Sequence, residues 1–155
     1  VATLNKKSIS KKDFKKFHPS GNLGARLKSV EDLMLIKNRI PFIDENSSMK
    51  QALNIITQKK LGTLIVQDSR KNTSGIITDG QIRRINQKNH NLYDLTVKQV
   101  MTKNPIKVDK EMLAAKALSI MNEKKITSLC VVDSSNKKKT IGILHIHNLL
   151  QDNIN

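Results

Sequence analysis

The chain contains no tryptophan, 3% aromatic residues and one cysteine among 155 residues. With so few aromatic side chains, a core must be assembled from isoleucine, leucine, valine and methionine. One cysteine excludes an internal disulfide. Because Cys130 lies within the apolar run SLCVV at 128–132, we expect its thiol to pack as a small buried side chain with no catalytic role.

Long apolar runs are also missing. No stretch approaches the roughly 20 apolar residues that a membrane-spanning helix requires. The opening residues VATLNKKSISKK lack the apolar segment of a secretory signal. We therefore expect a cytoplasmic protein with no membrane contact, built as one domain or as two small ones.

Acidic residues are scarce: 13 Asp and Glu stand against 28 Lys and Arg, giving a formal net charge of +15. A basic surface attracts phosphate, so a nucleic-acid-binding protein is one hypothesis. However, 23 of the basic residues are lysines spread among Asn and Ile, and only residues 1–28 are densely basic, with eight Lys and Arg against one Asp. This spread, and the lack of aromatic residues for base stacking, disfavour that hypothesis.

An internal repeat organises most of the chain. VEDLM at 30–34 corresponds to VKQVM at 97–101, and GII at 75–77 corresponds to GIL at 142–144, both 67 residues later. Between them, KLGTLIV at 60–66 matches KITSLCV at 125–131 with an offset of 65. The offset changes only in polar connections, where loops vary in length. We therefore divide the chain into residues 1–29, a first repeat at 30–93 and a second at 94–155.

Each repeat is predicted to be a β-α-β-β-α unit of an α/β (α+β) fold. Extended segments at 40–43 and 106–108 lead into helices, and strands at 64–66 and 129–132 and at 75–78 and 140–145 precede a closing helix. The spacing of the apolar residues predicts the helical faces, which are Met49, Ala52, Leu53 and Ile56 in one repeat and Ala114, Ala117, Leu118 and Met121 in the other. Ser48 and Gln51 predict a capping box. The repeats should pack sheet on sheet or helix on helix with approximate twofold symmetry.

The start of each closing helix carries the candidate binding residues. Thr78 ends GIIT and can cap the helix or, with free backbone N–H groups, hold a phosphate. His145 takes the corresponding place and can donate to an anion when protonated or stack on a base. His145 and His147 supply only two nitrogen ligands, with no Cys or carboxylate at a matching spacing, so we expect no metal. A symmetric pair leaves two equivalent clefts, and we favour ligand binding there over a purely structural pairing.

The segment HPSGNLG at 18–24 concentrates glycine and proline ahead of the repeats. A catalytic loop, a phosphate cradle and a hinge are all possible roles for such a segment. It lacks the glycine spacing and the lysine of a P-loop, which disfavours the cradle.

Taken in order, these stretches resemble a known family. The duplicated unit, with Gly, two aliphatic residues and Thr before a helix, resembles the CBS domain pair (the Bateman module), whose clefts commonly bind adenine nucleotides. HPSGNLGARL, VEDLM, GIITDGQIRR, VMTKNP, KITSL and IGILHIHNLL resemble the C-terminal part of the KpsF/GutQ family of D-arabinose-5-phosphate isomerases. The resemblance covers nearly the whole chain.

The resemblance implies a parent enzyme that interconverts D-ribulose 5-phosphate and D-arabinose 5-phosphate for the Kdo branch of lipopolysaccharide synthesis. It implies that a sugar-isomerase (SIS) domain precedes this sequence and that residues 1–29 are the link from its end. His18 occupies the position of a family active-site histidine, whose acidic and basic partners lie in the SIS domain. By itself the chain should therefore be inactive, and a homodimer of CBS pairs within a tetrameric parent is expected.

The sequence departs from the nucleotide-binding pattern of the family at two positions. Gln81 and Asn148 stand where the pattern has an aspartate that accepts from both ribose hydroxyls. A neutral amide forms a weaker hydrogen bond to a hydroxyl than a carboxylate does, so weakened or altered binding of AMP or ATP is expected. CMP-Kdo is an alternative effector, and its phosphate and carboxylate would suit Thr78, Arg83, Arg84, His145 and His147. Arg83 and Arg84 can equally be solvated helix residues, and the pair can instead be an oligomerisation element with vestigial clefts.

Overall fold

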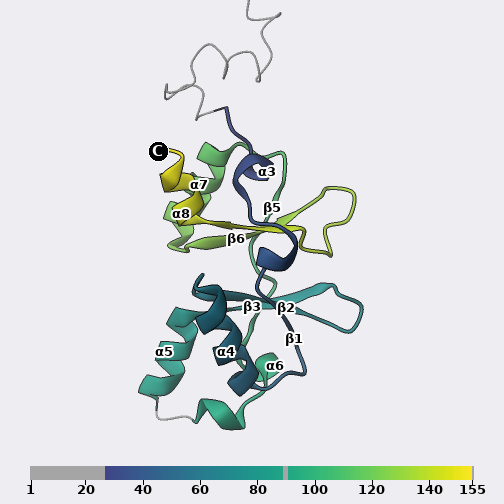
Figure 1. The fold of residues 1–155 in the computed structure, drawn as a ribbon, viewed down its shortest axis with the longest axis vertical. Helices are drawn as coiled ribbons and strands as arrows, with labels where there is room; N and C mark the ends of the chain where they lie inside the picture. Colours follow the sequence, from purple (N-terminus) through teal and green to yellow (C-terminus); the bar gives the residue numbers. More distant parts are fainter. Residues whose placement is uncertain (1–26, 89–90, 155) are drawn as a thin grey trace, which may run out of the picture.

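A computed structural model describes residues 27–88 and 91–154. The HPSGNLG segment and His18 lie outside the described residues. Two small mixed sheets form the frame (Figure 1). The first has the order β1-β2-β3-β4 and the second β5-β6-β7. The strands are β1 Phe42–Asp44, β2 Thr63–Gln67, β3 Thr73–Thr78, β4 Thr102–Lys103, β5 Lys107–Asp109, β6 Ser128–Val132 and β7 Gly142–His145.

Each repeat folds as the predicted β-α-β-β-α unit. In both, the first strand pairs with the second in parallel and the second with the third in antiparallel fashion. The main helices are α4 Met49–Lys59, α5 Asp79–Gln87, α7 Ala114–Lys124 and α8 Ile146–Gln151. Shorter helical turns are α3 Val30–Leu33, η1 Lys37–Arg39, η2 Leu92–Asp94 and α6 Val97–Val100. Within the described ranges, no helix has the length and apolar character to cross a bilayer.

Helix α4 begins with the capping box that its sequence predicts, and α4 and α7 end in the same way. Ser48 and Gln51 form the predicted capping box at α4, where Gln51 N donates to Ser48 Oγ and Ser48 N donates to Gln51 Oε1, both at 3.2 Å. After α4 and α7 the chain turns through Lys60 (φ 58°) and Lys125 (φ 55°), which are both in the left-handed conformation. The loops that lead to β2 and β6 therefore leave their helices in the same way.

The repeats meet sheet against sheet, with the helices farther out (Figure 1). Ile40, Ile65, Cys130 and Ile143 form the apolar cluster between the sheets. Near the hairpins, the hydroxyls of Thr73 and Thr140 lie 2.6 Å apart. Cys130 is fully buried, and burial raises the pKa of its thiol to about 11. At neutral pH the thiol is protonated and packs as a core side chain, as the sequence predicts.

The leading segment of each repeat packs into the other repeat's core. Val30 of α3 lies in the apolar core under α7 and α8, whereas Val97 and Val100 of α6 lie in the core under α4. Leu35 and Ile143 exchange backbone hydrogen bonds of 2.9 and 3.0 Å. Figure 1 shows α3 beside α7 and α6 beside α4. The two repeats are therefore held together by exchanged segments as well as by their sheets.

The packing of each leading segment against the other repeat also explains why the VEDLM and GII motifs recur together in both repeats. A Cβ added to Gly75 would lie 2.7 Å from Met101 Sδ and 2.8 Å from the carbonyl oxygen of Thr102. A Cβ added to Gly142 would lie 2.5 Å from Met34 Sδ. The methionine that ends one repeat's leading segment thus occupies the space left by the glycine in the other repeat's strand.

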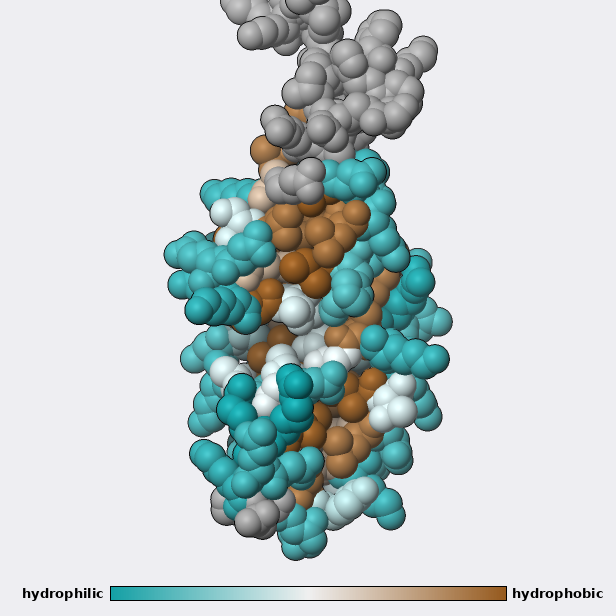
Figure 2. All heavy atoms as spheres, turned by 90° about the vertical axis from the view of Figure 1, so that its left-hand side faces the viewer, coloured by the Kyte–Doolittle hydropathy of each residue, from teal (hydrophilic) through white to brown (hydrophobic). Residues whose placement is uncertain are grey.

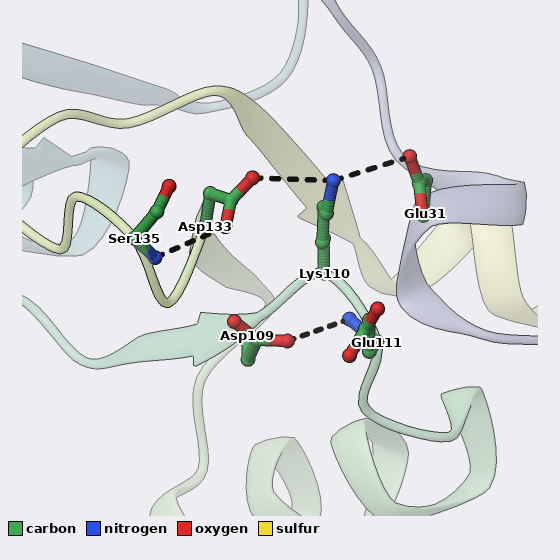
Figure 3. Close-up of polar contacts among 6 residues, drawn as sticks. All are labelled: Glu31, Asp109, Lys110, Glu111, Asp133 and Ser135. Atoms are coloured by element: carbon green, nitrogen blue, oxygen red, sulfur yellow. Dashed lines mark hydrogen bonds and ion pairs between the residues drawn. The ribbon is translucent and has the colours of Figure 1, made fainter.

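Lys110 forms ion pairs both with the leading segment and with the second repeat (Figure 3). Its Nζ lies 3.2 Å from an oxygen of Asp133 and 3.9 Å from one of Glu31 in α3. The hydrogen bond to Asp133 raises the pKa of Lys110, and the Ser135 backbone N–H and Lys110 lower the pKa of Asp133. Both groups are therefore charged at neutral pH, although exposed pairs of this kind contribute little stability.

Candidate functional site

A cleft of about 740 Å³ opens between the two repeats. Corresponding loops of both repeats line it, together with the connector that leads into β5. Six of the seven predicted ligand-binding residues border this one cleft, namely Thr78, Gln81, Arg83, Arg84, His145 and His147. Asn148 is not among the lining residues. The repeat predicted two equivalent clefts, whereas the structure brings the corresponding residues of both repeats to one shared cavity.

The cleft is strongly cationic. Lys60, Arg83, Arg84 and Lys125 line it, against the single carboxylate of Asp79. Excess positive charge in a partly enclosed cavity concentrates anions. Figure 2 views the side that carries α5, α7 and α8, where a pale band of weakly polar residues separates an upper and a lower apolar patch. The arrangement suits an anionic ligand of small-molecule size.

Sequence reasoning missed both lysines. Lys60 and Lys125 are corresponding residues of KLG and KIT in the aligned repeats, so the repeat itself carried the signal. Both follow a helix in the left-handed conformation and line the cleft. The loops that begin at these lysines accept corresponding backbone hydrogen bonds from the start of the closing helix. Asp79 N donates to Gly62 O (3.0 Å), and Ile146 N donates to Thr127 O (2.8 Å).

The side-chain amide of Gln81 makes all of its hydrogen bonds within the fold. Its Oε1 accepts from Thr78 N at 2.8 Å and from Thr78 Oγ1 at 3.3 Å. Its Nε2 donates to Thr102 Oγ1 at 2.6 Å and to the Val100 carbonyl oxygen at 3.3 Å. An amide has two acceptor and two donor positions, and all four are used. A ribose hydroxyl can therefore bind Gln81 only by displacing one of these contacts.

Asn148 has the corresponding role in the second repeat. Its Oδ1 accepts from His145 N at 3.0 Å, which caps α8. The amides at both positions are thus parts of capping boxes. This explains in structural terms why a neutral amide can stand where the nucleotide-binding pattern has a carboxylate.

His145 caps α8 and reaches into the other repeat. Its Nδ1 accepts from His147 N at 3.1 Å, so a neutral ring carries its proton on Nε2. The side chain is nearly buried, at 7% exposed. Burial, followed by the nearby His147, lowers the pKa of His145, whereas a hydrogen bond to the backbone of Leu61 raises it. The imidazole is therefore neutral at neutral pH and joins the two sides of the cleft, and it is not the free cation that the sequence allowed.

His147 lies in α8 and not on the strand with His145. Its ring centroid is 4.5 Å from that of His145, and the rings are tilted by 58°. The two imidazoles thus form a pair at the edge of the cleft. Among residues 27–88 and 91–154, no three His, Cys, Asp or Glu side chains are grouped to hold a metal ion.

Comparisons with known proteins identify the fold and the family. The model of the CBS domain family matches residues 30–88 and 97–152. The chain is 37% identical over 148 residues to an uncharacterized protein of Rickettsia prowazekii, covering 93% of this chain and 44% of that protein. It is 35% identical over 152 residues to arabinose 5-phosphate isomerase KdsD of Escherichia coli K12, covering 97% of this chain and 45% of the isomerase. The chain thus spans less than half the length of these curated relatives.

Solved structures share the same architecture. CBSX2 of Arabidopsis thaliana, solved in complex with AMP, is 26% identical, with a TM-score of 0.70 over 79% of this chain and 93% of that one. The CBS pair of MJ0100, solved with 5′-methylthioadenosine and S-adenosyl-L-methionine, is 21% identical, with a TM-score of 0.69 over 80% and 94%. With both repeats matched by the family model and the same fold in CBS-pair proteins, the chain belongs to the CBS domain family.

Proposed function

We propose that the chain is the ligand-sensing CBS pair of an arabinose-5-phosphate isomerase. The similarity to KdsD over 97% of the chain supports the assignment to such an enzyme. The observation that carries the sensing role is the cationic cleft, to which both repeats contribute corresponding loops. A ligand that touches both repeats can change how they sit on each other, and the exchanged segment α3 connects that change to the residues before it.

The effector we propose is a nucleotide or nucleotide-sugar. AMP in the CBSX2 complex supports an adenine nucleotide, AMP or ATP. The occupied amides at Gln81 and Asn148 favour weaker ribose binding, by about 1–2 kcal/mol per site relative to a carboxylate. CMP-Kdo adds a carboxylate to its phosphate, and the cations of the cleft lie in both repeats, with Arg83 and Arg84 in the first and Lys125 in the second. It would be the end product of the pathway that the parent enzyme supplies.

In the proposed parent, catalysis belongs to the SIS domain. Aldose–ketose isomerisation needs a general base that moves a proton between adjacent carbons and a group that opens the sugar ring. We assign His18 to that active site, with its partners in the SIS domain and residues 1–29 as the link to the CBS pair. The chain by itself, a cytoplasmic regulatory module in this proposal, has no isomerase activity.

Thermal unfolding of the chain with AMP, ATP, CMP and CMP-Kdo tests the sensing role. A ligand at a hundred times its Kd stabilises the folded state by about 2.7 kcal/mol. For a chain of this size, that raises the unfolding midpoint by about 5–10 °C. Inorganic phosphate at the same ionic strength is the control for general anion effects. If none of the four nucleotides raises the midpoint at millimolar concentration, the sensing role is rejected.

An oligomerisation element is the second candidate. Leu113, which precedes α7, is 47% exposed, and Leu150 in α8 is 53% exposed. Figure 2 shows apolar patches on this side of the molecule. Exposed apolar surface of this kind marks protein–protein contacts. A homodimer of CBS pairs whose clefts are vestigial gives no response to the nucleotide panel, so the same titration separates the two candidates.

A further inference from the structure

The two repeats use the hydroxyl at the start of their middle strands differently. Thr63 and Ser128 begin β2 and β6, and they pair with Thr78 and His145 on the neighbouring strands. Thr63 Oγ1 donates to the Ile77 carbonyl oxygen at 3.2 Å. Ser128 is 7% exposed, and its Oγ has no hydrogen-bond partner in the part of the chain that the structure describes. Ser128 lines the cleft, whereas Thr63 does not.

A buried hydroxyl without a partner destabilises the folded state. An alanine at this position would fill nearly the same space without that penalty. A serine hydroxyl turns between three staggered positions about one bond, and it can both donate and accept. Ser128 borders the cleft and its Oγ is buried, so a turn about χ1 is what would bring the hydroxyl to an occupant of the cleft.

The walls of the cleft indicate which part of a ligand Ser128 would meet. Apolar side chains line it alongside the cations, namely Leu61, Ile76, Pro105, Ile106 and Ile126. Ile106 lies beside β6, since its carbonyl oxygen accepts from Cys130 N at 3.3 Å. Three threonines also line the cleft, but among the described residues only Ser128 brings a buried hydroxyl without a partner to this wall. An apolar wall with such a hydroxyl suits a planar ring that has a polar edge. A sugar phosphate would leave this wall unused.

We propose that Ser128 reads the polar edge of a nitrogen heterocycle, the base of a nucleotide whose phosphate lies among the cations of the cleft. The inference rests on the effector cleft proposed above and adds the residue that selects the base. The serine hydroxyl can donate to a ring nitrogen or accept from an exocyclic amine, and both groups occur side by side in adenine and cytosine.

Calorimetric titration of the full chain with AMP, CMP and ribose 5-phosphate tests this, together with thermal unfolding without ligand. Ser128→Ala is expected to weaken binding of AMP or CMP by about three- to tenfold. Binding of ribose 5-phosphate, which has no base, should change less than about twofold. Without ligand, Ser128→Ala should raise the unfolding midpoint by about 2–4 °C, because it removes an unpartnered buried hydroxyl. The matched control Thr63→Val removes a bonded hydroxyl and should lower it.

Three results would overturn the inference. If Ser128→Ala lowers the midpoint as Thr63→Val does, the hydroxyl has a partner within the fold. If nucleotide affinity is unchanged, or if ribose 5-phosphate is weakened equally, Ser128 does not read the base, and the effector cleft itself stands. If the unaltered chain binds neither AMP nor CMP, both the inference and the nucleotide-sensing cleft fail.

Discussion

Replacing Gly75 by alanine is expected to destabilise the protein by about 2 kcal/mol or more. The new Cβ would lie within 3 Å of Met101 Sδ, Met101 Cγ and the carbonyl oxygen of Thr102. Met101 can change its rotamer, but the carbonyl belongs to β4, which pairs with β3 at this point. The exchanged strand must therefore move away from β3. A fall in the thermal midpoint of roughly 5–10 °C is the expected measurement.

Two other glycines provide matched controls for Gly75→Ala. At Gly142 the nearest backbone atom to an added Cβ, Leu35 O, is 3.1 Å away and the closer atoms belong to Met34, so Gly142→Ala should destabilise less. At Gly80 the nearest atom is Arg84 Nη1 at 3.4 Å, and alanine favours the helix, so Gly80→Ala should be neutral or stabilising. If Gly75→Ala unfolds at the same temperature as Gly80→Ala, the close contact between the exchanged segment and β3 is wrong.

Removing Arg83 and Arg84 together should weaken nucleotide binding by about tenfold or more. Both guanidinium groups are exposed and line the cleft, so they are free to turn toward a bound phosphate. A hydrogen bond to a charged group contributes about 1.5–3 kcal/mol, and solvent screening at the exposed cleft reduces this. Calorimetric titration with AMP at a fixed, stated salt concentration measures the change.

Arg70→Ala is the control for that experiment. Arg70 is exposed in the hairpin between β2 and β3 and does not line the cleft. It changes the net charge without changing the site, so its effect on affinity should be small. Equal affinities for the Arg83→Ala/Arg84→Ala variant and the Arg70→Ala variant would mean that Arg83 and Arg84 are solvated helix residues, the other role that their sequence allowed.

The local structure of each repeat could be predicted because its causes are local. Ser48 and Gln51 are three residues apart and form their capping box by themselves. The apolar spacing of α4 and α7 predicted faces that are buried at Met49, Ala52, Ala117 and Met121. The repeat offset then located Thr78 and His145 at corresponding positions, and both border the cleft.

The exchange of leading segments could not be predicted, because its partners lie far apart in the sequence. Nothing around Val30 indicates that it packs in the core of the second repeat, since an apolar residue fits either core. The state of Gln81 depends in the same way on Thr102, which is 21 residues farther along and approaches only through β4. The pKa of His145 likewise depends on burial, which lowers it, and on the backbone of Leu61 in the other repeat, which raises it. Repeats reveal equivalent positions, but they do not show which copy supplies the neighbour.

Backbone amide NMR of the isotope-labelled chain during titration with AMP tests most directly the claim that both repeats form one effector cleft. The account predicts saturable shifts in corresponding loops of both repeats, at Gly62 and Gly80 in the first and at Thr127 and His147 in the second. Arg70 and Ser135, in the two hairpins and outside the cleft, should not respond. Shifts confined to one repeat, or largest at the hairpins, would contradict the account.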